Sequence, residues 1–229
     1  MADLVTYERT DRVSTITMDD GKVNVFSIPM LRAVHEAFDR AEEDGTVVLL
    51  TGRPGYFSAG FDLKVFRETP EDTTTLLHLG ATLAERILSF PTPVAVACPG
   101  HAFPAGAFLL MAADTRVGAD GPFKLGLNEV RIGLSLPWFA IVLARHRMTP
   151  AAFDHAVVTG EMLDPEGART AGLLDRVVPV HELADAGRAA AEDLTAVDVS
   201  AHKATKLRAR QKVLEELRWS IESELTHTG

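Results

Sequence analysis

Two short apolar runs, each followed by a loop of small residues, constrain the fold of this chain more than any other feature. Residues 47–51 (VVLLT) and 93–98 (PVAVAC) lack the alternation of a half-buried strand, so we expect strands that are buried on both faces of a sheet. Residues 52–60 and 100–106 are rich in Gly, Pro and Ala, as loops are. Helical patterns follow both loops, and this alternation predicts an α/β core.

The first half of the chain supplies the other elements of that core. Residues 13–18 (VSTITM) alternate apolar and polar positions, which predicts a half-buried strand. Ser27 has the position of an N-cap, with Pro29 in the first turn of the helix that follows. The apolar face of that helix comprises Met30, Leu31, Val34, Phe38 and Ala41. Further along we expect helices from Asp62 onward, over 73–89 and over 105–111, and a strand over 115–117.

The second half of the chain is predicted to be mostly helical. We expect helices over 150–158, 164–171, 180–194 and 199–225. The segment 194–199 is the expected hinge. The chain is therefore divided into a core, residues 1–194, and a C-terminal helical segment, residues 195–229, whose last helix could face a neighbouring subunit.

Charge and composition exclude several classes of protein. Lys and Arg number 23 against 32 Asp and Glu, a net charge of −9, whereas a nucleic-acid-binding protein usually has a basic face. The apolar runs are shorter than the roughly 18 residues of a spanning helix, so we expect no membrane insertion. With Cys98 as its one cysteine and no apolar signal region at the N-terminus, the chain is expected to be cytoplasmic.

The two loops of small residues could bind an anion. In each, a buried strand leads through a tight turn to the start of a helix, where backbone N–H groups lack intrahelical partners. Two such turns that face each other would direct two N–H donors at one oxygen atom, as in an oxyanion hole. Each loop taken alone could equally be an ordinary strand-to-helix turn.

Glu129 is the candidate acid or base. It lies among apolar and small residues in the segment 125–133 (LGLNEVRIG). Burial would raise its pKa and make it a usable base near neutral pH. The alternatives are a solvated loop carboxylate and an ion pair with Arg131.

Other polar residues are weaker candidates. His101 could line the pocket or pack in the core, and Cys98 has the position of a core residue. His146 and His155 lack partners at metal-ligand spacing, so we expect no metal. The basic residues of the last helices could either meet phosphates or form a solvated face; they are Lys203, Lys206, Arg208 and Arg210.

Several segments, in this order, resemble the enoyl-CoA hydratase/isomerase (crotonase) family, and the resemblance extends over residues 5–225. The segments are 24–27 (NVFS), 57–62 (FSAGFD), 100–106 (GHAFPAG), 128–133 (NEVRIG), 159–161 (TGE) and 168–179 (ARTAGLLDRVVP). The resemblance implies a spiral of ββα turns followed by a C-terminal helical trimerisation region. It also implies a homotrimer or a dimer of trimers.

The same resemblance assigns roles to individual residues. It implies that an acyl-CoA thioester is the substrate, that coenzyme A is part of that substrate, and that no separate cofactor is needed. The thioester oxygen would accept hydrogen bonds from the N–H groups of Phe61 and Ala105. Glu129 would move the proton. The residues expected to contact the substrate are Ala59, Gly60, Gly106 and Phe108.

The chain departs from the hydratases of this family at one position. They hold water with two glutamates, of which one corresponds to Glu129 and the other falls on Phe108. Moving a double bond needs a single base, so the sequence favours Δ3,Δ2-enoyl-CoA isomerisation in fatty-acid metabolism. The alternatives are an enoyl-CoA hydratase of weak or altered activity and an acyl-CoA-binding protein without catalysis.

Overall fold

A six-stranded sheet is the centre of the molecule in the computed structural model, which describes residues 3–67 and 69–226. Its strand order is β1-β2-β4-β7-β9-β12; β1 is antiparallel to β2, and the other neighbours are parallel. The strands are β1 (Val5–Thr10), β2 (Val13–Met18), β4 (Val47–Thr51), β7 (Val94–Cys98), β9 (Thr115–Ala119) and β12 (Arg176–Val178). The predicted α/β core is confirmed, and so are the strands within residues 13–18, 47–51 and 93–98.

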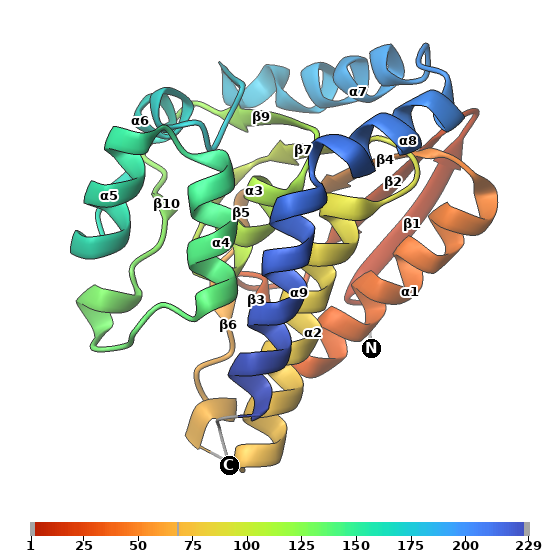
Figure 1. Cartoon of the computed structure of the whole chain (residues 1–229). Coiled ribbons are helices and arrows are strands. Elements are labelled where there is room, and N and C mark those ends of the chain that lie inside the picture. The colour runs from red at the N-terminus through yellow and green to blue at the C-terminus, as the bar shows by residue number, and fades with distance from the viewer. Residues whose placement is uncertain (1–2, 68, 227–229) are drawn as a thin grey trace.

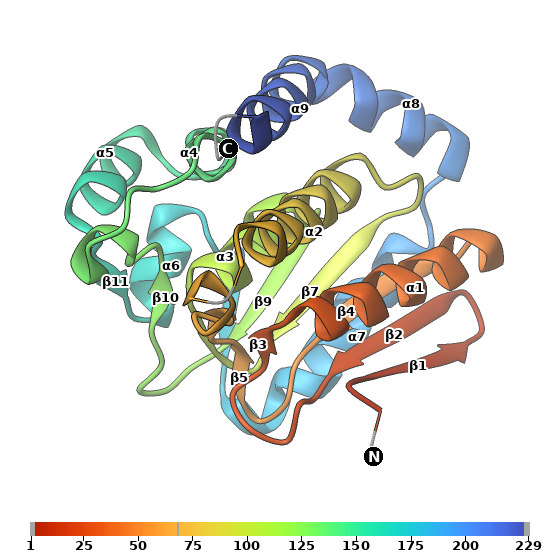
Figure 2. The ribbon, with the colours of Figure 1, turned by 90° about the horizontal axis from the view of Figure 1, so that it is seen from below.

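Each turn of the chain repeats one pattern, a strand in this sheet, a short strand outside it and then a helix (Figures 1 and 2). The short strands form a second sheet of order β11-β10-β8-β5 and a pair, β3 with β6. Their bounds are β3 (Val25–Phe26), β5 (Gly55–Ser58), β6 (Gly60–Phe61), β8 (Gly100–Ala102), β10 (Leu125–Gly126) and β11 (Met162–Leu163). The helices that close these turns are α1 (Ile28–Asp44), α2 (Pro70–Ser89) and α3 (Pro104–Ala112). This is the expected spiral of ββα turns.

Both faces of the central strands are buried, which explains why their sequences lack alternation. Val48 and Leu50 of β4 belong to the main core, which also includes α1, α2 and α3. Leu49 of β4 and Ala97 of β7 point to the opposite face, where they pack with Leu183 of α7 (Leu183–Leu194). Helix α7 lies across β4, β7 and β9 on that face (Figure 1).

The first helix follows its capping signals closely. Ser27 caps α1, and its Oγ accepts a hydrogen bond from the Met30 N–H at 3.3 Å. Gly45 ends the helix at a φ of 64°, a left-handed conformation that Gly adopts without steric cost. The predicted apolar face of this helix is buried.

The remaining helices complete the fold around this core. They are α4 (Trp138–Arg147), α5 (Pro150–Thr159), α6 (Pro165–Ala171), α8 (Val199–Ala209) and α9 (Gln211–Thr226), with 3₁₀ turns η1 (Val65–Arg67), η2 (Glu129–Ile132) and η3 (Val180–Glu182). Helix α9 packs against α2 and α4 of the same chain. Its Leu214, Leu217 and Ile221 join the main core. Part of the expected segment 195–229 thus packs on the core through these three residues, and residues 227–229 lie outside the described part of the chain.

Two sequence predictions about helices are wrong. The helix expected from Asp62 is only the short turn η1, because the Asp62 carboxylate accepts the Lys64 N–H at 3.0 Å in a local turn. The next helix, α2, starts at Pro70 with Thr69 as its cap. The single helix expected over 199–225 is broken at Arg210, whose side chain turns inward to Asp114 and to the carbonyl of Leu88.

The pattern analysis also missed elements. Strand β1 is an edge strand with mostly exposed positions, so its sequence has no clean alternation. Helix α4 begins after Pro137 and was not predicted. The helix expected over 180–194 begins with the 3₁₀ turn η3 and continues as α7.

Candidate active site

A cavity of about 310 Å³ lies where several turns of the spiral meet the C-terminal helix. Its wall is formed by β6, the start of α3, η2, the segment that leads to α4, and the end of α9. Five of the residues singled out in the sequence line it: Ala59, Gly60, Phe61, Phe108 and Glu129. The other lining residues are Leu63, Phe66, Leu77, Phe103, Pro104, Asn128, Ile132, Leu134, Ser135, Leu136, Pro137 and Glu224.

The backbone of β6 lies directly against the first turn of α3. Gly60 has a φ of 88°, and a Cβ built there would lie 3.7 Å from the backbone nitrogens of both Ala105 and Pro104. A side chain larger than a methyl group would enter this narrow space, and an L-residue would be strained at this φ. Glycine at position 60 therefore allows the two predicted donor segments to meet.

Each of these two segments has a backbone N–H group that takes no part in the hydrogen bonds between β3 and β6 or within α3. Phe26 pairs with Phe61, and the Asp62 N–H donates to the Phe26 carbonyl at 3.1 Å. Successive N–H groups of a strand alternate in direction, so the Phe61 N–H points away from β3. Ala105 is the second residue of α3, whose N-cap Phe103 makes no side-chain hydrogen bond within the described structure. The Ala105 N–H lies in the first turn of α3, where backbone N–H groups have no intrahelical acceptor.

Glu129 is a buried carboxylate on the same cavity. It is the first residue of η2 and is 7% exposed. Its Oε2 has no hydrogen-bond partner among the described residues. Burial raises the pKa of Glu129 to about 7, against a smaller lowering by its own backbone amide. The carboxyl group can therefore take up and release a proton near neutral pH.

The alternatives for Glu129 do not agree with this geometry. Arg131 donates from its Nε to the carbonyl of Thr159 at 3.2 Å, so the alternative of an ion pair between Arg131 and Glu129 is replaced by a backbone contact. Because Glu129 is buried, it is not a solvated loop carboxylate either. The local sequence left these alternatives open, because the apolar neighbours Val130 and Ile132 are exposed while Glu129 is buried.

Phe108 gives the cavity an aromatic wall. Its ring meets the edge of Phe61 at 6.3 Å and that of Phe139 at 5.5 Å between centroids. Edge-to-face rings of this kind pack favourably and contribute no proton donor or acceptor. This part of the site is therefore built to exclude water.

The other two small residues have different positions. Ala59 lines the cavity and donates its N–H to the Val23 carbonyl at 3.0 Å. Gly106 faces Ser58, and a Cβ there would lie 3.0 Å from the Ser58 Cβ. Glycine at 106 thus lets α3 approach β5, which is a packing role beside the cavity.

His101 and Cys98 are packing residues in this structure. The imidazole of His101 lies in an aromatic cluster with Tyr56, Phe103 and Phe123, and its Nδ1 accepts the Lys124 N–H at 3.0 Å. Burial lowers its pKa, which favours the neutral ring. Burial raises the pKa of the Cys98 thiol to about 12, so this thiol is unreactive.

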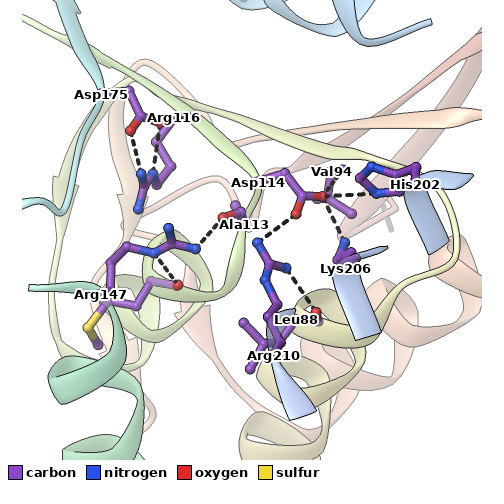
Figure 3. Close-up of polar contacts among 11 residues, drawn as sticks. Leu88, Val94, Ala113, Asp114, Arg116, Arg147, Asp175, His202, Lys206 and Arg210 are labelled. Carbon is purple, nitrogen blue, oxygen red and sulfur yellow. Dashed lines mark hydrogen bonds and ion pairs between the residues drawn. The ribbon is translucent and has the colours of Figure 1, made fainter. Parts of the chain in front are cut away.

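Two of the four basic candidates are in the interior and not on a solvated face. Lys206 and Arg210 form ion pairs with Asp114 at 2.7 and 2.8 Å, and Val94 donates its N–H to the same carboxylate at 2.8 Å (Figure 3). Because these two cations are held by Asp114, they are poor candidates for coenzyme A phosphates. Lys203 and Arg208 are exposed on α8.

Sequence reasoning missed Glu224 and the segment from Leu134 to Pro137 as parts of the cavity wall. No local pattern marks Glu224, because α9 brings it to the cavity from 95 positions beyond Glu129. In the described ranges, no group of three or more His, Cys, Asp or Glu side chains is placed to hold a metal ion. No helix in these ranges has the length and apolarity needed to cross a membrane.

Comparisons with known proteins identify the family of this chain. Residues 8–227 match the family model of enoyl-CoA hydratase/isomerase. The crystal structure of an enoyl-CoA hydratase/isomerase family protein from Pseudomonas syringae is 47% identical, with a TM-score of 0.97 over 99% of both chains. A protein from Mycobacterium tuberculosis that is 36% identical is named an enoyl-CoA isomerase in one solved structure, with a TM-score of 0.93 over 99% of this chain and 100% of that one. The same protein is named a probable enoyl-CoA hydratase in another, with a TM-score of 0.93 over 96% of this chain and 94% of that one.

A curated relative carries the other activity of the family in its name. A probable enoyl-CoA hydratase from Bacillus subtilis is 33% identical over 168 residues, which are 71% of this chain and 64% of that protein. The matched part thus spans less than two thirds of that relative's length. The family model nevertheless covers nearly the whole of this chain, and the fold is the crotonase-like one. This chain belongs to the enoyl-CoA hydratase/isomerase family.

Proposed function

We propose that this protein is a Δ3,Δ2-enoyl-CoA isomerase that acts on acyl-CoA thioesters through an enolate. One observation carries the proposal: Glu129, a buried carboxylate whose pKa is raised to about 7 by burial, shares a cavity with the aromatic ring of Phe108. The resemblance to the family implies that the hydratases have their second glutamate at the position of Phe108. A single base can move a double bond, whereas hydration also needs an ordered water molecule.

The proposed mechanism assigns each step to a group of this chain. The Glu129 carboxylate removes a proton from the carbon between the thioester carbonyl and the double bond of a 3-enoyl-CoA. The C–H electron pair then forms the enolate, whose oxygen accepts hydrogen bonds from the Phe61 and Ala105 N–H groups. Donors of this kind are worth about 3–4 kcal/mol each in comparable sites. The protonated Glu129 returns its proton to the far carbon of the former double bond, which yields the 2-enoyl-CoA.

The surroundings of Glu129 favour this chemistry. The rings of Phe61 and Phe108 lower the local dielectric constant, so each hydrogen bond to the enolate oxygen is stronger than it would be in water. The reaction needs no cofactor beyond the coenzyme A of the substrate. The M. tuberculosis relative is named an isomerase in one structure and a probable hydratase in another, so it favours neither activity, while the B. subtilis relative named a hydratase supports the main alternative.

A substrate panel tests the assignment. The purified protein is incubated with 3-enoyl-CoA and 2-enoyl-CoA of several chain lengths, and the products are followed by mass spectrometry and by absorbance of the conjugated thioester. We expect 2-enoyl-CoA from the first substrate and little 3-hydroxyacyl-CoA from the second. Hydration of 2-enoyl-CoA at about 10 s⁻¹ or above, a common rate for enzymes, would mean that the protein is a hydratase and not an isomerase. Binding without turnover of either substrate would leave a non-catalytic acyl-CoA-binding protein.

We also propose that the chain assembles as a trimer or a dimer of trimers. Trp219 on α9 and Trp138 at the start of α4 are 62% and 58% exposed in the single chain, and large exposed apolar side chains are common at subunit interfaces. Light scattering at micromolar concentration tests the proposal. A stable monomer would refute it.

A further inference from the structure

Gly80 lies in the middle of α2 and is buried on the face that this helix turns toward the core. A glycine inside a helix is less favourable than alanine by about 1 kcal/mol. The φ of Gly80 is not positive, so no left-handed backbone calls for a glycine here. The reason for this glycine therefore lies in what packs against it.

The aromatic ring of Phe61 occupies the space that a side chain at position 80 would need. A Cβ built on Gly80 would overlap the ring atom Cε1 and would lie 2.5 Å from Cζ, whereas packed carbon atoms lie about 3.5–4.0 Å apart. The same ring contacts Phe66 and Phe108, at 6.4 and 6.3 Å between ring centroids. The Phe61 ring is thus packed among α2, η1 and α3.

Helix α2 is also attached to α1 close to this contact. The carbonyl of Leu79 accepts a hydrogen bond from His35 Nε2 at 3.0 Å, and Arg86 forms an ion pair with Asp39 at 2.7 Å. These contacts oppose a movement of α2 away from β6. A methyl group added at position 80 would therefore displace the Phe61 ring and not the helix.

The Phe61 ring and the Phe61 N–H are bonded to the same residue backbone, so a displaced ring also displaces the donor. This N–H belongs to the peptide that joins Gly60 to Phe61, and Gly60, at a φ of 88°, restricts that peptide little. Strand β6 has only two residues, so few hydrogen bonds fix its orientation. The packed ring is an anchor for this donor, and a misplacement of about 1 Å in a site can lower the rate about 10²-fold.

We propose that Gly80 is a positioning residue for the Phe61 donor. By leaving room for the Phe61 ring, Gly80 holds the Phe61 N–H at the place where it meets the thioester oxygen. The inference rests on the proposed function in one respect, that the cavity binds an acyl-CoA thioester with its carbonyl oxygen at the Phe61 and Ala105 N–H groups.

The test compares Gly80→Ala with Gly187→Ala in the full chain. Gly187 is the matched control, because it is buried within α7, outside the cavity wall, and a Cβ there would lie 2.8 Å from the Ala97 Cβ. Infrared difference spectra are recorded for bound butanoyl-CoA that carries a heavy carbon isotope at the thioester carbonyl. Hydrogen bonds to the oxygen weaken the C=O bond and lower its stretching frequency, so the spectra report the donors without any turnover.

We expect the bound carbonyl to shift to lower frequency in the wild type and in Gly187→Ala, and to lose roughly half of this shift in Gly80→Ala, because one of two donors is displaced. The kcat for 3-enoyl-CoA should fall by about 10²-fold in Gly80→Ala, on the scale of one lost donor, and stay near the wild-type value in Gly187→Ala. An unchanged carbonyl shift in folded Gly80→Ala would overturn the proposal. So would weaker binding with an unchanged shift in the bound ligand, because the ring would then only block the cavity.

Phe61→Leu shows whether Gly80 acts through the ring. Leucine lacks Cε1 and Cζ, so this variant removes both the anchor and the atoms that the added methyl group would meet. We expect Phe61→Leu alone to weaken the carbonyl shift, and Gly80→Ala to have no further effect in that background. An equal effect of Gly80→Ala with and without the ring would overturn the proposal. If Gly80→Ala does not fold, Phe61→Leu decides alone, and a wild-type shift in this variant would overturn the proposal.

The spectra separate this inference from the proposed isomerase. A weakened shift in Gly80→Ala, in a protein that turns over neither enoyl-CoA, would support the role of Gly80 and refute the isomerase. A wild type that binds butanoyl-CoA without any shift of the carbonyl would refute the assignment of the donors and this inference with it.

Discussion

Two carboxylates of this chain, Asp114 with a side chain 11% exposed and the buried Glu129, have opposite environments. Asp114, which follows α3, accepts the Val94 N–H and forms ion pairs with Lys206 and Arg210 (Figure 3). Glu129, on the candidate active site, is 7% exposed and has an oxygen without a partner in the described structure. Burial of an unpaired carboxylate costs free energy. The ion pairs of Asp114 offset this cost, whereas the described residues leave Glu129 without such a partner.

The contrast between Asp114 and Glu129 shows where ion pairs stabilise this fold and where it keeps a reactive group. The side chains around Asp114 tie α8 and the start of α9 to the N-terminal end of β7, so they join segments that are far apart in the sequence. Among the described residues no cation pairs with Glu129, and burial raises its pKa to about 7. A shifted pKa in a cavity is typical of a functional site, whereas a fully paired carboxylate is typical of a structural one.

The largest expected effect is on stability at Asp114. Asp114→Asn keeps the shape but removes the charge that Lys206 and Arg210 share. Two buried cations would then lack compensation, and breaking a buried ion pair typically costs about 3–5 kcal/mol. We expect the free energy of unfolding in denaturant to fall by that amount.

A control keeps this prediction specific. Glu216→Gln removes an exposed ion pair between the same C-terminal helix and α4, and exposed pairs contribute at most about 1 kcal/mol. If Asp114→Asn lost no more stability than Glu216→Gln, the contrast between the two carboxylates would have no energetic basis.

The next effect is on turnover at Glu129. Glu129→Gln keeps the shape of the side chain and cannot accept a proton. We expect turnover of 3-enoyl-CoA to fall by about 10²-fold or more, the scale of general base catalysis, with little change in acyl-CoA affinity. Glu166→Gln is the control, because Glu166 is 60% exposed and pairs only locally with Arg169. Wild-type turnover in folded Glu129→Gln would remove Glu129 from the mechanism.

The sequence predicted best what depends on local pattern. The uninterrupted apolar runs of β4 and β7 reflect burial on both faces, and Ser27 caps α1 through a contact three residues away. Glu129 was a candidate from its apolar surroundings, but its local sequence left a solvated or paired carboxylate open, and the family resemblance singled it out; its neighbours Val130 and Ile132 are themselves exposed. The loops around Phe61 and Ala105 were predicted separately, and Gly60 brings them together.

The sequence could not predict what depends on distant contacts. Lys206 and Asp114 are 92 positions apart, so a basic helix face looked solvated although two of its cations are buried. The break of the last helix at Arg210 has the same origin. Glu224 reaches the cavity only because α9 packs along α4. Asp62 shows a different error, because a residue predicted to start a helix accepts the Lys64 N–H in a local turn.

A smaller effect is expected on stability at Glu129 itself. Burial raises its pKa from 4.5 to about 7. Between these values the unfolded chain is ionised while the folded chain holds a proton, so the free energy of unfolding falls as pH rises, by up to about 1.4 kcal/mol per unit. Glutamine does not titrate. We therefore expect the free energy of unfolding of Glu129→Gln, relative to that of the wild type, to rise by about 2 kcal/mol between pH 5 and pH 8. Denaturant unfolding of both proteins at each pH measures this difference. A difference independent of pH would mean that Glu129 is not desolvated in the folded chain.

The smallest expected effect is on the pH dependence of catalysis by the unpaired carboxylate Glu129. Glu129 must be ionised to remove a proton, and its pKa is raised to about 7 by burial. The value of kcat/KM reports the ionisation of the free enzyme, so it should rise about tenfold per pH unit below this pKa and level off above it. The measurement is kcat/KM for one 3-enoyl-CoA from pH 5.5 to pH 8.5. The Glu166→Gln control should keep the same inflection, because its carboxylate is exposed and outside the cavity wall. A profile that is flat across this range would show that the group which removes the proton is already ionised at pH 5.5, as expected for a solvated or paired carboxylate. The unpaired Glu129 would then have no catalytic advantage over a paired one.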